Sequence, residues 1–202
     1  MPRLLIHICC APCAVHPISL LQNEGIDVTG FWFNPNIHPF LEFKKRLLEV
    51  QRLAKLCDFT LIENDSYEIG KFLKAIINAS DTVNRCDVCY EYRLAETAKF
   101  ASENGFDSFT TTLLHSKYQQ HESIREIGEN LANEFNIEFL YRDFRHGWSK
   151  GLDLSRKFKL YRQQYCGCIF SEYERFHDTA DKVLDDFEWQ PRRKESGTNI
   201  PE

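Results

Sequence analysis

The placement of cysteine constrains this chain more than any other feature of its sequence. Of the eight cysteines, Cys57 stands alone at the end of a helical segment and is expected to be a core residue. The other seven fall in three short motifs, the first of which follows an apolar run at residues 4–8 that predicts a buried strand. The motifs are CCAPC with Cys9, Cys10 and Cys13, CDVC with Cys86 and Cys89, and CGC with Cys166 and Cys168.

Length and composition favour a single domain. A chain of 202 residues can bury one substantial core, and we expect one α/β metal-binding domain over residues 1–190, followed by a disordered polar tail at 191–202. No stretch approaches the ~20 apolar residues of a membrane span, and the N-terminus lacks a signal-peptide pattern. We therefore expect a cytoplasmic protein without membrane association, whose clustered thiols are metal ligands or redox catalysts rather than disulfides.

Strand-like and helix-like segments alternate along the chain. This alternation predicts a three-layer α/β/α fold with a mostly parallel five-stranded sheet. Functional side chains gather at the carboxyl ends of the strands in such sheets. The predicted strands cover residues 4–8, 26–33, 59–63, 107–114 and 137–141, and the predicted helices cover 14–24, 43–56, 67–78, the segment from the second motif to about 105, 121–135, part of 147–159, and a segment starting at 169.

The cysteine motifs are placed to converge at this edge of the sheet. Residues 10–13 form the predicted turn between the first strand and helix, and Cys86 and Cys89 begin another helix, whose N-terminus favours thiolates. Cys9 and Cys10 are adjacent at the end of a strand and are expected to point to opposite sides. The sequence therefore predicts a metal centre at this edge.

The identity of the metal is left open by the spacing of the cysteines. Four thiolates suit either zinc or an iron–sulfur cluster, and seven exceed the need of one four-ligand site. The excess suggests either a cluster with a second metal or a cluster with reactive cysteines. Two other functions compete with a metal-dependent enzyme: a thiol-based sulfur-transfer or redox enzyme, and a zinc-stabilised RNA-binding module.

Four segments taken together resemble the epoxyqueuosine reductases of the QueH type. They are CCAPC, RCDVCY at residues 85–90, TTLLHSKYQ at residues 111–119, and CGCIFSEYER at residues 166–175. The resemblance implies a PP-loop/HUP-like fold and an oxidoreductase that performs the last step of queuosine biosynthesis. In that step the epoxide of epoxyqueuosine at the wobble position of tRNA is reduced to give queuosine. No Ser-Gly-Gly-x-Asp-Ser loop follows the first strand, so ATP use is not expected.

The same resemblance implies the cofactors, a [4Fe-4S] cluster and an adjacent mononuclear metal ion, expected to be iron. The family pattern leads us to expect Pro after Ser116, where this chain has Lys117, a change that touches loop shape or a phosphate contact. Asp87 is either a metal ligand or the cap of the helix that begins there. The expected cluster ligands are Cys10, Cys86, Cys89 and Cys168, and the expected ligands of the second metal are Cys9, Cys13, Cys166 and Asp87.

Removal of the epoxide oxygen needs two electrons and protons, so an unidentified electron donor and a proton donor are implied. The candidate catalytic residues are Asp87, Tyr90 and Tyr118, with His16 and His115 as further candidate proton donors. The net charge of −5 argues against a uniformly basic coat, although residues 142–162 carry seven Lys/Arg and two Asp. Phosphate contacts are expected from Arg145, Lys150, Arg156, Lys157 and Lys159, and base stacking from Trp32, Phe33 and Trp148.

Overall fold

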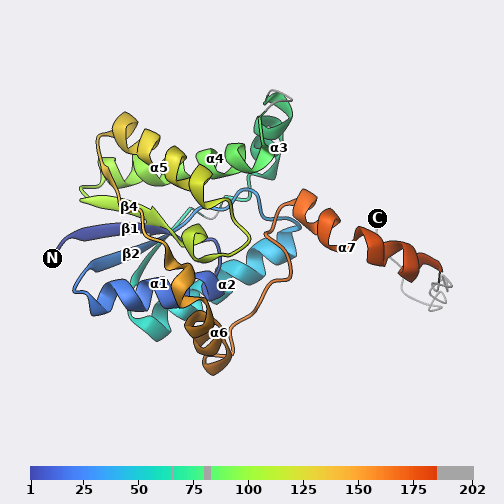
Figure 1. Ribbon diagram of the computed structural model, residues 1–202, viewed down its shortest axis with the longest axis horizontal. Coiled ribbons are helices and arrows are strands. Elements are labelled where there is room, and N and C mark those ends of the chain that lie inside the picture. The colour runs from blue at the N-terminus through green and yellow to red at the C-terminus, as the bar shows by residue number, and fades with distance from the viewer. Residues whose placement is uncertain (65, 80–82, 186–202) are drawn as a thin grey trace, which may run out of the picture.

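The computed structural model describes residues 1–64, 66–79 and 83–185 (Figure 1). Its centre is a five-stranded sheet in which every pairing is parallel, with the strand order β3-β2-β1-β4-β5. This confirms the predicted α/β fold. The strands are β1 (Arg3–His7), β2 (Asp27–Trp32), β3 (Thr60–Glu63), β4 (Ser108–Thr111) and β5 (Glu138–Phe139).

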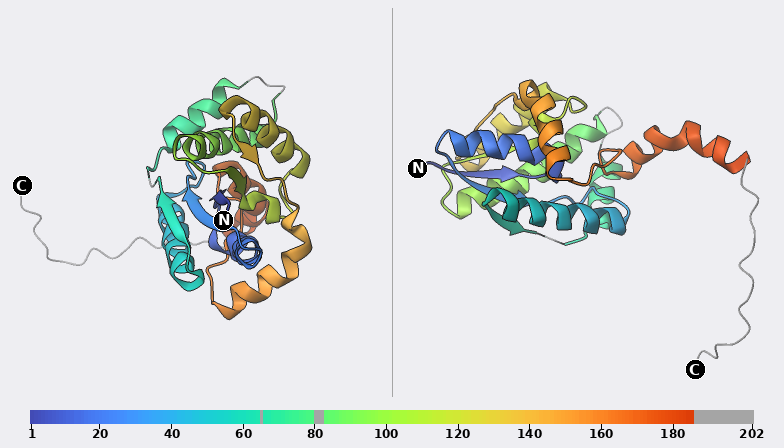
Figure 2. Two further views of the ribbon diagram at one scale, coloured as in Figure 1. Left: turned by 90° about the vertical axis from the view of Figure 1, so that its left-hand side faces the viewer. Right: turned by 90° about the horizontal axis from the view of Figure 1, so that it is seen from below.

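Helices cover both faces of the sheet (Figures 1 and 2). On one face α1 (Ala11–Asn23) packs against α2 (Phe40–Cys57) and α6 (Trp148–Lys157). On the other face α4 (Arg85–Glu103) packs against α3 (Ile69–Asn78) and α5 (His121–Phe135). The helix α7 (Ile169–Asp185) extends away from these layers. None of the described helices combines the length and the apolar character that crossing a membrane requires.

The sheet is buried on both faces, which explains the continuous apolar run at its centre. Leu4, Leu5 and Ile6 of β1 are fully buried, as expected for the central strand of a parallel sheet covered by two helical layers. At the end of β2, Trp32 packs edge-on against Phe43 of α2, with ring centroids 5.6 Å apart. The hydrophobic core therefore extends to the carboxyl edge of the sheet, next to the cysteine motifs.

The strand order creates a switch point between β1 and β4. The chain runs from β1 to β2 and β3 on one side and returns to β4 and β5 on the other, so the loops after β1 and β4 diverge and leave a crevice. A short 3-10 helix, η1 (Thr112–His115), follows β4. The amide of Cys9 donates to Oγ1 of Thr112 at 3.0 Å, which places the first cysteine motif in this crevice.

Several predicted boundaries differ from the structure. The strand expected over residues 107–114 ends at Thr111, whose side chain accepts a hydrogen bond from the amide of Leu113 and starts η1. The first helix begins at Ala11, so Cys13 lies within its first turn rather than before it. The fifth strand, expected over residues 137–141, has only two residues, although the amide of Leu140 still donates to the carbonyl of Phe109 at 2.9 Å. The tail predicted at 191–202 and the domain boundary at 190 lie outside the described residues.

The packing of α5 on β5 gives a direct test of the fold. A Cβ atom added to Gly128 would overlap the ring of Phe139, whereas one added to Gly70 in α3 would meet nothing within 4 Å. We expect Gly128→Ala to lower the free energy of unfolding by about 1–3 kcal/mol through overpacking. Gly70→Ala should be neutral or stabilising by up to ~1 kcal/mol. Urea unfolding followed by circular dichroism measures both, and equal effects would contradict this packing.

Candidate active site

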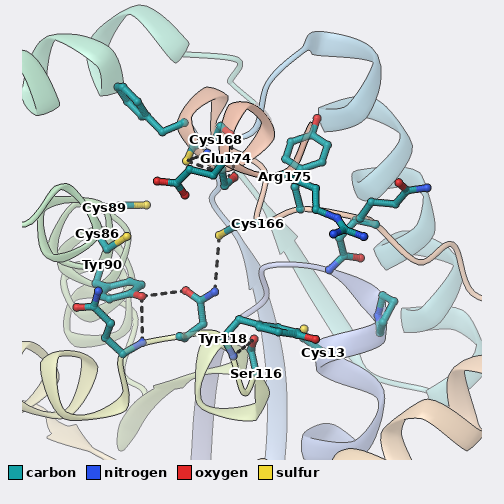
Figure 3. Close-up of a pocket in the computed structure, with 18 of the residues that line it drawn as sticks. Cys13, Cys86, Cys89, Tyr90, Ser116, Tyr118, Cys166, Cys168, Glu174 and Arg175 are labelled. Carbon is teal, nitrogen blue, oxygen red and sulfur yellow. Dashed lines mark hydrogen bonds between the residues drawn. The ribbon is translucent and has the colours of Figure 1, made fainter. Parts of the chain in front are cut away.

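All three cysteine motifs contribute to one cavity, as the sequence predicted. The cavity has a volume of about 730 Å³ and lies at the carboxyl edge of the sheet. Figure 3 shows sulfur atoms reaching it from α1, from α4 and from the segment before α7. Its lining cysteines are Cys13, Cys86, Cys89, Cys166 and Cys168.

The thiols of the first motif form a compact group. The sulfur atoms of Cys9, Cys10 and Cys13 lie within 4.8 Å of one another, and those of Cys9 and Cys10 are 3.8 Å apart. The expectation that Cys9 and Cys10 point to opposite sides is therefore wrong. The strand ends at His7, and Cys10 is already the N-cap of α1, so neither cysteine follows the alternation of a strand.

The close contact among these three thiols gives them different pKa values. Hydrogen bonds from Cys10 and Cys13 lower the pKa of Cys9 well below its ordinary value. Burial raises the pKa of Cys10, and hydrogen bonding to Cys10 and Cys9 raises that of Cys13. Without a metal, Cys9 is therefore the most acidic of the three thiols.

The second motif occupies the first turn of α4. Asn84 caps this helix by accepting a hydrogen bond from the amide of Cys86 at 2.9 Å, so the alternative role of Asp87 as the cap is wrong. Cys86 and Cys89 are three residues apart and lie on one face of the helix. Burial raises the pKa of Cys89 to about 12 and also raises that of Cys86.

Asp87 lies outside the cavity lining, and its Oδ1 is buried without a hydrogen-bond partner among the described residues.

A buried arginine fixes the third motif. Arg46 of α2 donates to the carbonyl oxygens of Cys166 at 2.8 Å and Tyr165 at 3.1 Å. Its Nε donates to Glu42 at 2.7 Å, and Glu42 also accepts from the hydroxyl of Tyr161 at 2.8 Å. The segment that carries Cys166 and Cys168 is thereby tied to α2.

Gly167 allows this segment to approach α2 closely. Its φ of +127° disfavours a side chain, and an added Cβ would lie 3.0 Å from both Nη1 of Arg46 and Cγ1 of Ile37. The carbonyl of Gly167 accepts a hydrogen bond from the amide of His38 at 2.7 Å. One residue later, the carbonyl of Cys168 accepts from the hydroxyl of Ser171 at 2.8 Å, at the start of α7.

A second buried arginine lies among the thiols. Arg93 of α4 is 1% exposed, and its Nε donates to the carbonyl of Cys89 at 3.2 Å. Its Nη2 has no hydrogen-bond partner in the described part of the chain. Burial opposes its charge, but coulombic interaction with the sulfur groups of Cys89, Cys166 and Cys9 raises the pKa of Arg93 overall. A buried cation with a free donor group requires an anionic neighbour.

Two of the other candidate residues line the cavity in different ways. Tyr90 is 2% exposed, its hydroxyl donates to Gln119 at 3.0 Å, and burial raises its pKa. Gln119 in turn donates to the sulfur of Cys166 at 3.8 Å, as Figure 3 shows. Tyr118 also lines the cavity but is 84% exposed. Neither His16 nor His115 is among the lining residues.

The candidate RNA-binding residues are only partly available. Trp32 is fully buried and Phe33 is 5% exposed, so the expectation that they stack on bases is wrong because both belong to the core. Trp148 does line the cavity. Arg145 pairs with Asp143 and Arg156 with Asp153, whereas no ion pair forms at Lys150, Lys157 or Lys159 within the described residues.

Comparison with known proteins identifies the family. The sequence model of "Epoxyqueuosine reductase QueH" matches residues 4–174. The chain belongs to the QueH family. A protein of this name from Dehalococcoides mccartyi is 38% identical over 175 residues, which cover 87% of this chain and 95% of that protein. Another from Thermotoga maritima is 35% identical over 188 residues, which cover 90% and 96% of the two chains.

Solved structures confirm the fold of this QueH chain. A structure of the predicted subunit of a tRNA methyltransferase from Methanocaldococcus jannaschii superposes with a TM-score of 0.50 over 76% of each chain. The identity is 13%, so this likeness concerns the fold alone.

The two buried arginines of this QueH chain were not predicted from its sequence, although a signal was present. Arg46 follows Phe43 by three residues and precedes Val50 by four, which places it on the apolar face of α2. Arg93 stands four residues after Cys89 and next to Leu94 on the buried face of α4. A charged residue on the apolar face of an amphipathic helix indicates a buried partner, but the sequence does not say which.

Arg46 can be tested against Arg52, which lies on the same helix and also donates to carbonyl oxygens, but is 42% exposed. Arg46→Met leaves Glu42 and two carbonyl groups without their donor, and we expect a loss of about 3 kcal/mol in the free energy of unfolding. Arg52→Met should cost less than about 1 kcal/mol. Urea unfolding and the rate of alkylation of Cys166 in the metal-free protein are the measurements. Unchanged alkylation in Arg46→Met would contradict the proposed tether.

Proposed function

We propose that this chain is an epoxyqueuosine reductase that acts on tRNA. The observation that carries the proposal is the convergence of the family's three cysteine motifs on one cavity. In the reaction, both C–O bonds of the epoxide break, two electrons and two protons are taken up, a C=C bond forms and the oxygen leaves as water. The electrons come from a donor that the sequence does not identify.

The residues of the cavity fit an iron–sulfur cluster with an adjacent metal ion. Five thiols line the cavity and those of Cys9 and Cys10 lie within 4.8 Å of the thiol of Cys13, and the buried guanidinium of Arg93 offers a donor to an anionic group. Asp87 lies outside this lining, but its buried Oδ1, which lacks a partner among the described residues, suits a cation. When bound, these cofactors would supply electrons one at a time and a Lewis acid for the epoxide oxygen.

The geometry favours one revision of the expected ligand sets. Cys10 is grouped with Cys9 and Cys13, whereas Cys166 lines the cavity together with the cysteines of α4. We therefore propose that Cys9, Cys10 and Cys13 hold one metal, with Asp87 retained as the candidate fourth ligand. We propose that Cys86, Cys89, Cys166 and Cys168 hold the [4Fe-4S] cluster.

The protein's own groups would orient the substrate and manage protons. Tyr90 keeps its proton because burial raises its pKa, and its hydroxyl faces the cavity through Gln119. We propose Tyr90 as the residue that holds a proton at its hydroxyl oxygen near the leaving oxygen. A target base must leave the anticodon stack to enter such a cavity. Arg85, Arg162 and Arg175 line it and would attract the backbone phosphates.

A thiol-based redox or sulfur-transfer enzyme acting on tRNA is the second candidate function. It is favoured by Cys9, a thiol of lowered pKa that lies beside the thiols of Cys10 and Cys13. Such an enzyme would need no iron. A zinc-stabilised RNA-binding module would need only four of the seven thiols and would be colourless. An absorbance spectrum of the anaerobically purified protein, with iron and sulfide analysis, separates the three.

The cluster ligands provide the first test of the proposed activity. Cys86→Ser or Cys89→Ser is expected to abolish both the brown colour and the conversion of epoxyqueuosine to queuosine, because serine does not replace a cluster thiolate. Cys57→Ser, at the end of α2 and away from the motifs, should keep both. Iron analysis and mass spectrometry of tRNA nucleosides are the measurements. Full turnover by an iron-free protein would refute the iron-dependent reaction.

Salt dependence tests the tRNA substrate. If the cationic side chains of the cavity contact phosphates, raising salt from about 50 to 200 mM should weaken tRNA binding about tenfold or more. Arg162→Gln should flatten the plot of log K against log salt by about one unit of slope. Lys99→Gln, an exposed change on α4 outside the cavity lining, should leave the slope unchanged. Binding that is insensitive to salt would rule out these contacts.

A further inference from the structure

We infer that Tyr118 is a stacking platform for a nucleobase of the RNA loop, placed at the rim of the cavity. The inference rests on the proposed function, since it names how that substrate is held. It changes the role expected for Tyr118 from a proton donor to a binding residue. We use the word rim for the exposed lining residues Tyr118, Arg162 and Arg175.

The first observation is the exposure of an aromatic ring on a fixed segment. Tyr118 is 84% exposed, although the side chains of η1 just before it are buried. Its backbone amide donates to the hydroxyl of Ser116 at 3.2 Å. Two residues later, the amide of Gln120 donates to the hydroxyl of Tyr90 at 3.2 Å. The segment is therefore held on both sides of Tyr118, and the ring is presented outward on a supported loop.

The second observation is what surrounds this ring. Tyr118 lies edge-on to Trp148, with centroids 6.1 Å apart, and Trp148 lies 5.5 Å from the ring of His115. The ammonium group of Lys117 lies 5.7 Å from the centroid of Trp148. An aromatic surface therefore continues from the buried His115 to the exposed Tyr118, with a cation beside it. Base faces stack on such rings, and a neighbouring cation suits the phosphate.

The charges along the lining favour RNA over a peptide or an acidic protein as the occupant. Lining arginines are Arg85, Arg93, Arg162 and Arg175, and the one described lining carboxylate, Glu174, pairs with Arg85. Arg162 and Arg175 form no ion pair with any described residue. An aromatic platform flanked by cations matches single-stranded nucleic acid, whose bases and phosphates alternate along the strand.

The depth of the cavity explains why the platform stands at the rim. The epoxide must reach the thiols of α4 and of the third motif, which are half-buried or buried except for Cys166. The base of the same nucleotide, or its neighbour in the loop, is then left near the entrance. Tyr118 lines the exposed part of the cavity, so its ring is available for stacking on that base.

The test uses the iron-loaded full chain and a labelled anticodon stem-loop RNA with guanosine at the wobble position. Tyr118→Ala is expected to raise Kd between about fivefold and a hundredfold, the range for loss of one base–aromatic stack. Tyr118→Phe keeps the ring and should bind within about threefold of the natural protein, as expected for stacking. Tyr173, which is 68% exposed and lies outside the cavity lining, provides the matched control: Tyr173→Ala should not change Kd.

Salt dependence separates stacking from charge. Tyr118→Ala should lower affinity at every salt concentration without changing the slope of log K against log salt, because no counterion release is lost. Lys117→Gln should reduce that slope by about one.

Two results would overturn the inference: a Kd for Tyr118→Ala within twofold of the natural protein, or an equal loss in Tyr118→Phe, which would assign the role to the hydroxyl. Either of these results rejects only the stacking role if the natural protein still binds the epoxyqueuosine form of the RNA and reduces it. If it binds RNA with the expected pattern but forms no queuosine, the proposed reaction fails and the platform stands. Absence of RNA binding would reject both.

Discussion

The hydrogen bonds from Arg46 to the backbone of the third motif are the contact on which the cavity depends. The first two motifs are fixed by regular structure, one at the end of β1 and the other in the first turn of α4. Cys166 and Cys168 instead lie in an irregular segment between α6 and α7. Arg46 joins this segment to α2 through two carbonyl oxygens, and Gly167 lets it come close. This tether acts together with the hydrogen bond from the amide of His38 to Gly167, and both hold the segment that carries two of the seven sulfur atoms.

Burial sets the chemistry of the thiols that this tether brings together. Because burial raises the pKa of Cys86 and Cys89, these thiols hold their protons in the metal-free protein. A metal must displace those protons, so its affinity rises with pH. Arg93 works in the opposite direction, because its buried positive charge favours thiolates nearby. These opposing effects of burial and of Arg93 would suit the proposed cluster, whose binding would replace the thiol protons.

The fold and the chemistry come from separate features of the chain. The strand order with a switch point between β1 and β4 creates a crevice in many α/β proteins, and the likeness to a tRNA methyltransferase subunit concerns only this framework. Cysteines placed in the loops at the crevice, together with an exposed Tyr118 at the rim, would turn it into a site for an RNA-borne epoxide. The function belongs to those side chains.

The sequence by itself determined the order of strands and helices and the edge where the cysteines meet, because hydrophobic periodicity and motif position are local properties. It also identified the family, since four segments keep their order and spacing. Only the tertiary structure decided that Cys10 groups with Cys9 and Cys13, that Asn84 rather than Asp87 caps α4, and that Trp32 and Phe33 are core residues. It likewise revealed the buried Arg46 and Arg93. Burial and side-chain direction depend on what packs against a residue, and those neighbours come from distant parts of the chain.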